Sequence, residues 1–260
     1  MRFIAIIPAR YASSRFPGKP LADLGGKPMI QRVYEQAKKV LDTVIVATDD
    51  ERIAACVQSF GGEVVMTSPH HTCGTDRVWE AFLHYNELHQ LPLRDVVVVN
   101  IQGDEPFIQP DQIQALMACF PTEIATLVHP FTEHDSLSDL HNPNYVKVAI
   151  ARDATATDDT TMGKALYFSR GVIPYLRGVE ACDWLKQGQH FRHIGMYAYR
   201  ADVLEKITQL PPSPLEKLEC LEQLRWLENG LAIRVALTQH ASIGIDTPED
   251  LQHALQCLNS

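Results

Sequence analysis

The sequence predicts an α/β fold built on a doubly wound, mainly parallel sheet, and two observations support this. Nearly continuous apolar runs at residues 2–7, 43–48 and 95–101 are typical of parallel strands that are buried on both faces. Amphipathic segments separate these runs, so strand and helix alternate through the first half of the chain. Hydrophobic residues make up 45% of the 260 residues and charged residues 21%, which indicates a globular protein with a full core.

The amphipathic segments of the first half are expected to be helices. They cover residues 28–40, which Pro28 opens as a first-turn residue, 50–59, which ends before Gly61 and Gly62, and 75–90. In the second half we expect strands at 124–131, 146–151 and 191–200 and one helix at 215–230. Leucines form a stripe along that last helix, which suits either core packing or a subunit interface.

The domain organisation is predicted to be a single domain spanning residues 1–260. We find no internal repeat, low-complexity tract or linker that would divide the chain. The Thr- and Asp-rich segment 151–164 is expected to be a surface excursion, and its place before Arg170 leaves a lid role open.

Charge is distributed unevenly along the chain. The net charge is −9, yet residues 1–40 hold eight Lys and Arg against two Asp and Glu, which leaves −15 for the rest. Nucleic-acid binding needs a broad basic face, so this pattern argues against it and favours one small anionic ligand near the N-terminus. Six scattered cysteines without a C-x-x-C pair and the lack of a long apolar run predict a cytoplasmic protein without membrane insertion, disulfide framework or zinc site.

The basic residues gather in one loop, "IIPARYASSRFPGKPL" (6–21), directly after the first predicted strand. It lacks the glycines of a dinucleotide fingerprint and of a Walker A loop. Small residues that let backbone amides approach a ligand accompany Arg10, Arg15 and Lys19. Because arginine and lysine suit phosphate oxygens, we expect this loop to hold a triphosphate.

Displacement at a phosphorus centre also requires charge neutralisation, so we looked for ligands of Mg²⁺. Asp104 in "VNIQGDEPFI" (99–108) follows a buried strand and should emerge at the same sheet edge as the basic loop. Asp246 in "IGIDTPEDL" (243–251) precedes a predicted helix. Both are candidate magnesium ligands. A helix cap for Asp246 and a turn for Asp104 remain alternatives.

Taken together, the motifs "PARYASSRFPGKPL", "HHTCGTDR", "NIQGDEPF", "YFSR", "HIGMYAYR", "PSPLEKLE" and "GIDTPEDL" closely resemble those of 3-deoxy-manno-octulosonate (KDO) cytidylyltransferases. The resemblance runs in family order from about residue 3 to residue 254. It implies a nucleotidyltransferase-type, Rossmann-like domain with a mixed sheet, helices on both faces and a smaller sugar-side subregion. It also implies that the anomeric hydroxyl of KDO attacks the α-phosphorus of CTP, giving CMP-KDO for lipopolysaccharide and pyrophosphate.

By matching positions, the resemblance implies roles for individual residues. The CTP-binding set is Pro8, Ala9, Arg10, Arg15, Lys19, Cys73, Gly74, Arg77 and Gln102. The KDO-binding set is Gln102, Arg170, His193, Tyr197 and Glu216. Catalysis would rest on Arg15, Lys19 and Asp104, with Asp104 and Asp246 binding Mg²⁺.

Some of these assignments have simpler structural readings. His193 on a strand is more often a structural histidine, Gly74 could merely end a loop, and Glu216 could help to form the first turn of its helix. The family is commonly homodimeric, which implies a homodimer here. Alternative functions are cytidylyl transfer to 8-amino-KDO or a nonulosonate, a nucleotide-sugar-consuming transferase, and a non-catalytic nucleotide-binding protein.

Overall fold

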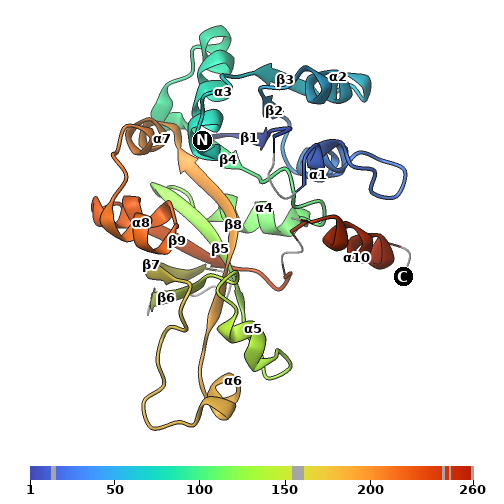
Figure 1. Ribbon diagram of the computed structural model, residues 1–260. Helices are drawn as coiled ribbons and strands as arrows, with labels where there is room; N and C mark the ends of the chain where they lie inside the picture. The colour runs from blue at the N-terminus through green and yellow to red at the C-terminus, as the bar shows by residue number, and fades with distance from the viewer. Residues whose placement is uncertain (13–15, 154–160, 242–243, 246, 259–260) are drawn as a thin grey trace. The chain divides into compact units, whose positions relative to one another are not determined.

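The computed structural model describes residues 1–12, 16–153, 161–241, 244–245 and 247–258 (Figure 1). The strands are β1 (Arg2–Ala9), β2 (Val44–Thr48), β3 (Glu63–Met66), β4 (Val96–Asn100), β5 (Ile124–Pro130), β6 (Lys147–Arg152), β7 (Thr161–Ser169), β8 (Phe191–Arg200) and β9 (Ile233–Leu237). The helices are α1 (Met29–Lys38), α2 (Glu51–Ser59), α3 (Gly74–His89), α4 (Pro110–Ala118), α5 (Leu137–His141), α6 (Trp184–Gln187), α7 (Ala201–Thr208), α8 (Pro214–Glu219), α9 (Gln223–Glu228) and α10 (Pro248–Leu258).

The chain forms two compact units. The first comprises Met1–Gln114, Ala198–Thr208 and Ser242–Ser260, and the second comprises Ala115–Tyr197 and Gln209–Ala241. A single domain over residues 1–260 therefore stays a prediction.

The first unit contains the parallel strands that the apolar runs predict. Strand order is β3-β2-β1-β4, followed by the end of β8, and β1 pairs in parallel with both β2 and β4. Ile6 aligns with Ile45 on one side and with Asn100 on the other. Every residue of β2 and β4 is buried, so both faces of these strands are covered. Helices α1, α2, α3 and α7 pack against this part of the sheet.

The second unit holds the antiparallel part of the fold. Its strand order is β8-β5-β9-β7-β6, in which β5 and β9 are parallel while β7 is antiparallel to both β9 and β6. Phe131, Leu140 and Trp184 form a core cluster in this unit. Parallel and antiparallel pairings thus occur together, which confirms the predicted mixed α/β fold.

The predicted helix over 215–230 is wrong, because the chain forms α8 and α9 with a break at Cys220. Cys220 adopts the left-handed conformation (φ 51°), which a continuous helix cannot contain. The leucine stripe is divided accordingly: Leu218 is 81% exposed, whereas Leu224 is fully buried.

Two smaller expectations also need correction. Pro28 is the N-cap of α1 rather than a residue of its first turn. The predicted excursion over 151–164 is shorter than expected, since β6 continues to Arg152 and β7 begins at Thr161. The intervening residues 154–160 lie outside the described residues.

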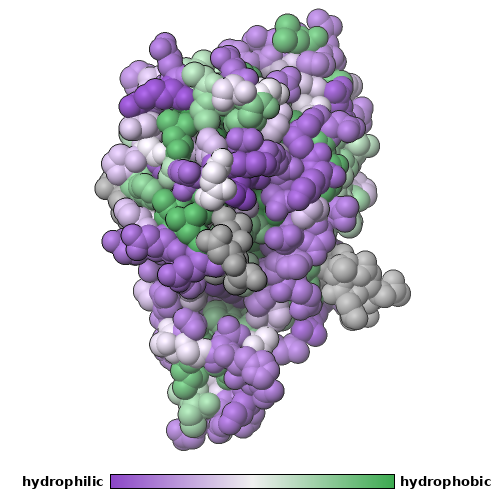
Figure 2. Space-filling view, turned by 90° about the vertical axis from the view of Figure 1, so that its right-hand side faces the viewer, coloured by the Kyte–Doolittle hydropathy of each residue, from purple (hydrophilic) through white to green (hydrophobic). Residues whose placement is uncertain are grey.

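The surface is mainly hydrophilic on the face that Figure 2 shows, where hydrophobic residues occur in small separate groups. Among the described residues, no helix combines the length and the apolar character that a membrane span requires. Cys56, Cys73, Cys119, Cys182 and Cys220 form no disulfide.

Candidate active site

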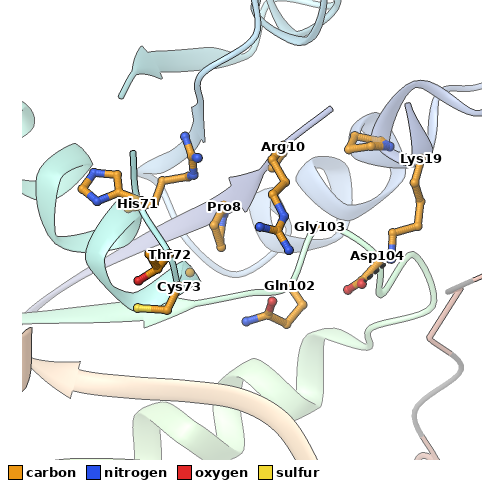
Figure 3. Close-up of a pocket in the computed structure, with 13 residues that line it drawn as sticks. Pro8, Arg10, Lys19, His71, Thr72, Cys73, Gln102, Gly103 and Asp104 are labelled. Atoms are coloured by element: carbon orange, nitrogen blue, oxygen red, sulfur yellow. Dashed lines mark hydrogen bonds and ion pairs between the residues drawn. The ribbon is translucent and has the colours of Figure 1, made fainter. Parts of the chain in front are cut away.

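A cleft of about 260 Å³ opens in the first unit where β1 and β4 end. Its lining comprises Pro8, Ala9, Arg10, Lys19, Pro20, His71, Thr72, Cys73, Gly74, Arg77, Gln102, Gly103 and Asp104. In the view of Figure 3, His71, Thr72 and Cys73 lie at one end, the Lys19–Asp104 pair lies at the other, and Arg10 and Gln102 lie between them. Ligands bind beyond the carboxyl ends of strands in open α/β sheets, so this is the expected place for a binding site.

Lys19 reaches the cleft through a tight turn that requires a glycine. Gly18 has φ 72° and donates its backbone N–H to the carbonyl of Tyr11 at 2.9 Å. A Cβ on Gly18 would lie 3.0 Å from the Tyr11 ring, so a larger residue would have a strained backbone conformation and a tight contact. The turn directs the ammonium group of Lys19 to Asp104.

Asp104 comes from the loop after β4. Its Oδ2 accepts a hydrogen bond from Lys19 Nζ at 2.6 Å, and its side chain is 33% exposed. Neighbouring Gly103 packs so closely that a Cβ there would be 3.1 Å from the carbonyl oxygen of Pro8. The end of β1 and the loop after β4 therefore approach each other closely at Gly103.

Gln102 and Arg10 complete the middle of the cleft. The amide Nε2 of Gln102 donates to Asn100 Oδ1 at 3.2 Å, and Arg10 is exposed. The structure therefore brings together Arg10, Lys19, Gln102 and Asp104. Arg15 and Asp246 lie outside the described residues, so their roles remain predictions.

Arg170, predicted to bind the sugar, lies in the second unit at the end of β7. Its guanidinium donates to three backbone carbonyls: Glu219 at 2.7 Å, Pro143 at 2.9 Å and Cys220 at 3.3 Å. These bonds place a cation where α8 ends, where the helix leaves carbonyl groups unpaired.

His193 and Tyr197 stand on β8 in the same unit, with ring centroids 5.3 Å apart. Burial lowers the pKa of His193 to about 3, so its ring is neutral near pH 7. Its Nε2 lies 3.1 Å from Thr126 Oγ1, and that hydroxyl donates to the carbonyl of Met196 at 2.9 Å. Burial raises the pKa of the Tyr197 hydroxyl well above its usual value.

Glu216 has well-defined structural partners. It forms a capping box with Ser213 at the start of α8, and its carboxylate receives two hydrogen bonds from Arg225 at 2.7 and 2.5 Å. The first-turn reading of Glu216 is therefore confirmed. Its predicted contact with the sugar stays a prediction.

Comparisons with known proteins agree with this geometry. A profile of cytidylyltransferases matches residues 4–234. A 3-deoxy-manno-octulosonate cytidylyltransferase of Parabacteroides distasonis is 56% identical over 99% of this chain and 98% of its own length. The corresponding protein of Thermodesulfovibrio yellowstonii is 46% identical over 99% of this chain and 98% of its own. The chain belongs to the 3-deoxy-manno-octulosonate cytidylyltransferase family.

A solved structure supports the membership of this cytidylyltransferase family. It is a CMP:2-keto-3-deoxy-manno-octonic acid synthetase complexed with CTP, and it is 39% identical to this chain, with a TM-score of 0.83. The match covers 100% of this chain and 99% of that one. A cytidylyltransferase of Leptospira borgpetersenii, 15% identical with a TM-score of 0.59, shares the fold.

Sequence reasoning missed four residues that line the cleft of this cytidylyltransferase: Pro20, His71, Thr72 and Gly103. A signal was present for three of them, since Pro20, Thr72 and Gly103 each lie directly beside a predicted site residue, and His71 lies two residues before Cys73.

The family implies a Mg²⁺ ion in this cleft. Within the described residues, no group of three or more His, Cys, Asp or Glu side chains could hold a metal ion. Mg²⁺ usually keeps several waters and takes only one or two carboxylates, so the partly exposed Asp104 fits this ion. The backbone N–H of Ile245, the residue before Asp246, donates to the Asp104 carbonyl at 3.1 Å.

Proposed function

We propose that this protein transfers CMP from CTP to the anomeric hydroxyl of KDO, giving CMP-KDO and pyrophosphate. The observation that carries the proposal is the convergence of Arg10, Lys19 and Asp104 on one cleft in a chain of this family. Two cations beside a carboxylate suit a triphosphate with its divalent cation.

The residues of the cleft would act mainly by positioning and by electrostatics. Arg10 and Lys19 bind triphosphate oxygens, and Lys19 opposes the charge that develops as pyrophosphate leaves. We assign the same role to Arg15. Asp104 and Asp246 would hold Mg²⁺, which, when bound, neutralises charge on the phosphates.

The sugar acid would be bound by Gln102, Arg170, His193, Tyr197 and Glu216. A neutral His193 ring carries one N–H donor and one acceptor nitrogen, so it can form a hydrogen bond with a sugar hydroxyl. Arg170 has five N–H donors, three of which serve carbonyl groups, so two donors remain for the sugar carboxylate.

We further propose that the protein acts as a cytoplasmic homodimer in lipopolysaccharide synthesis. Cytidylyl transfer to 8-amino-KDO or to a nonulosonate is an alternative that differs only in the acceptor. Sedimentation of the purified protein tests the dimer.

Pyrophosphate release tests the reaction directly. We expect release only when CTP, Mg²⁺ and KDO are all present, because the sugar hydroxyl is the nucleophile. Replacing CTP by UTP and KDO by sialic acid or 8-amino-KDO measures the specificity. Release from CTP without a sugar would indicate a hydrolase instead, and release only with another sugar acid would transfer the proposal to that acceptor.

A further inference from the structure

The loop between β3 and α3 forms one wall of the cleft but has no strand or helix of its own. Within residues 67–73, His71, Thr72 and Cys73 line the cleft (Figure 3). The backbone N–H of Thr67 donates a hydrogen bond to the carbonyl of Thr48 at 2.8 Å, which extends the pairing of β3 with β2 by one residue. The backbone N–H of His70 donates to Ser68 Oγ at 3.2 Å within the loop, and side chains of α3 supply further contacts.

Arg77, on the first turns of α3, holds the beginning of this loop. Its two terminal nitrogens donate to Thr67 Oγ1 at 2.5 Å and to Asp49 Oδ2 at 2.9 Å. Arg77 is only 4% exposed, and Asp49 directly follows β2. The planar guanidinium therefore joins the loop, the helix and the end of β2 at one point.

Glu80 holds the loop from the next turn of α3. Its carboxylate accepts the backbone N–H of Ser68 at 2.9 Å and contacts Nε2 of His71. A second histidine, His84, lies 3.7 Å from its other oxygen. One carboxylate thus joins residues near both ends of the loop, and it fixes the ring of a residue that lines the cleft.

We propose that Asp49 and Glu80 are positioning residues for nucleotide binding. Neither lines the cleft. Asp49 acts through Arg77 and Glu80 acts through His71, so that the wall is already in place when the nucleotide arrives. This inference rests on the proposed function only in taking CTP as the nucleotide.

The test measures CTP binding by calorimetry with Mg²⁺ and without sugar, using Asp49→Asn and Glu80→Gln. Charge-assisted hydrogen bonds are among the stronger ones, so we expect the Kd for CTP to rise about 5- to 20-fold in each variant. The KM for KDO and kcat at saturating CTP should stay within about twofold, a separation that a general loss of folding would not give.

Matched controls are available beside each position. Glu51 is exposed at the start of α2, two residues after Asp49, and Glu87 is exposed on the same helix as Glu80. Glu51→Gln and Glu87→Gln should bind CTP like the unmodified protein. Thr67→Val, which keeps the shape and removes the hydroxyl that Arg77 binds, serves if Asp49→Asn fails to fold.

The outcomes are separable. Unchanged CTP affinity in folded Asp49→Asn and Glu80→Gln, or in folded Thr67→Val, would overturn the positioning roles. An unmodified protein that does not bind CTP at all would overturn the proposed function instead. Equal weakening by the control variants would also contradict the inference, because it would show a general effect of surface charge.

Discussion

At the scale of single residues, the ion pair between Lys19 and Asp104 is the main electrostatic feature of the cleft. The two side chains are 12% and 33% exposed, so the pair is only partly screened by water. The cation proposed to bind the triphosphate therefore lies against the carboxylate proposed for Mg²⁺. Lys19 and a Mg²⁺ ion held by Asp104 would then both neutralise negative charge on the phosphates of the bound nucleotide.

Asp104→Asn tests this arrangement because it keeps the shape and removes the charge. We expect kcat to fall about 10²- to 10³-fold, the scale of losing one electrostatic group in an active site. The melting temperature should change by less than about 3 °C, since the side chain is not in the core. Pyrophosphate release and thermal unfolding measure the two effects. Asp42→Asn, an exposed position, is the control, and near-normal turnover of Asp104→Asn would remove Asp104 from the metal site.

At the scale of elements, α8 and α9 depend on the pair formed by Glu216 and Arg225. Burial alone would raise the pKa of Glu216, but the Arg225 guanidinium and the Ser213 amide outweigh it and lower that pKa below 4.5. The folded protein thus favours the charged form of the Glu216 carboxylate. Its contribution to stability is present above pH 4.5 and is lost as the pH falls through the lowered pKa.

Glu216→Gln should therefore lower the free energy of unfolding at pH 7 by about 1–3 kcal/mol, the scale of a charge-assisted hydrogen bond. The difference from the unmodified protein should shrink as the pH falls below 4.5. Urea unfolding at a series of pH values measures the free energy of unfolding of both proteins. Glu133→Gln, at an exposed position, should show no such difference. A deficit that persists unchanged in acid would show that shape rather than charge is responsible.

The elements differ in how far the sequence predicts them. Apolar runs predict β1, β2 and β4 because these strands are buried on both faces. No such run marks β3, whose residues are exposed or half-buried. The break between α8 and α9 could not be predicted from leucine spacing, since it lies at the left-handed Cys220, whose carbonyl accepts a hydrogen bond from Arg170, a residue distant in the chain.

At the scale of the whole molecule, the predicted site residues divide between the two compact units. Arg10, Lys19, Gln102 and Asp104 belong to the first unit, and residues such as Tyr197 belong to the second. The first group could be predicted because strands of a parallel sheet end at the same edge. The supporting contacts of Asp49 and Glu80 could not, since they join side chains that neither periodicity nor a motif pairs.

This division predicts that Lys19→Met weakens the binding of CTP, whereas Tyr197→Phe weakens the binding of KDO. Lys19→Met should raise the Kd for CTP about 10- to 100-fold, because it removes a positively charged hydrogen-bond donor to the phosphate oxygens. Tyr197→Phe keeps the buried ring and removes only the hydroxyl. It should raise the KM for KDO about 5- to 50-fold and change the CTP Kd, measured without sugar, less than about twofold. Calorimetry and steady-state kinetics on both variants measure the pattern. Tenfold weaker CTP binding by folded Tyr197→Phe would contradict it, since the hydroxyl would then serve the nucleotide rather than the sugar.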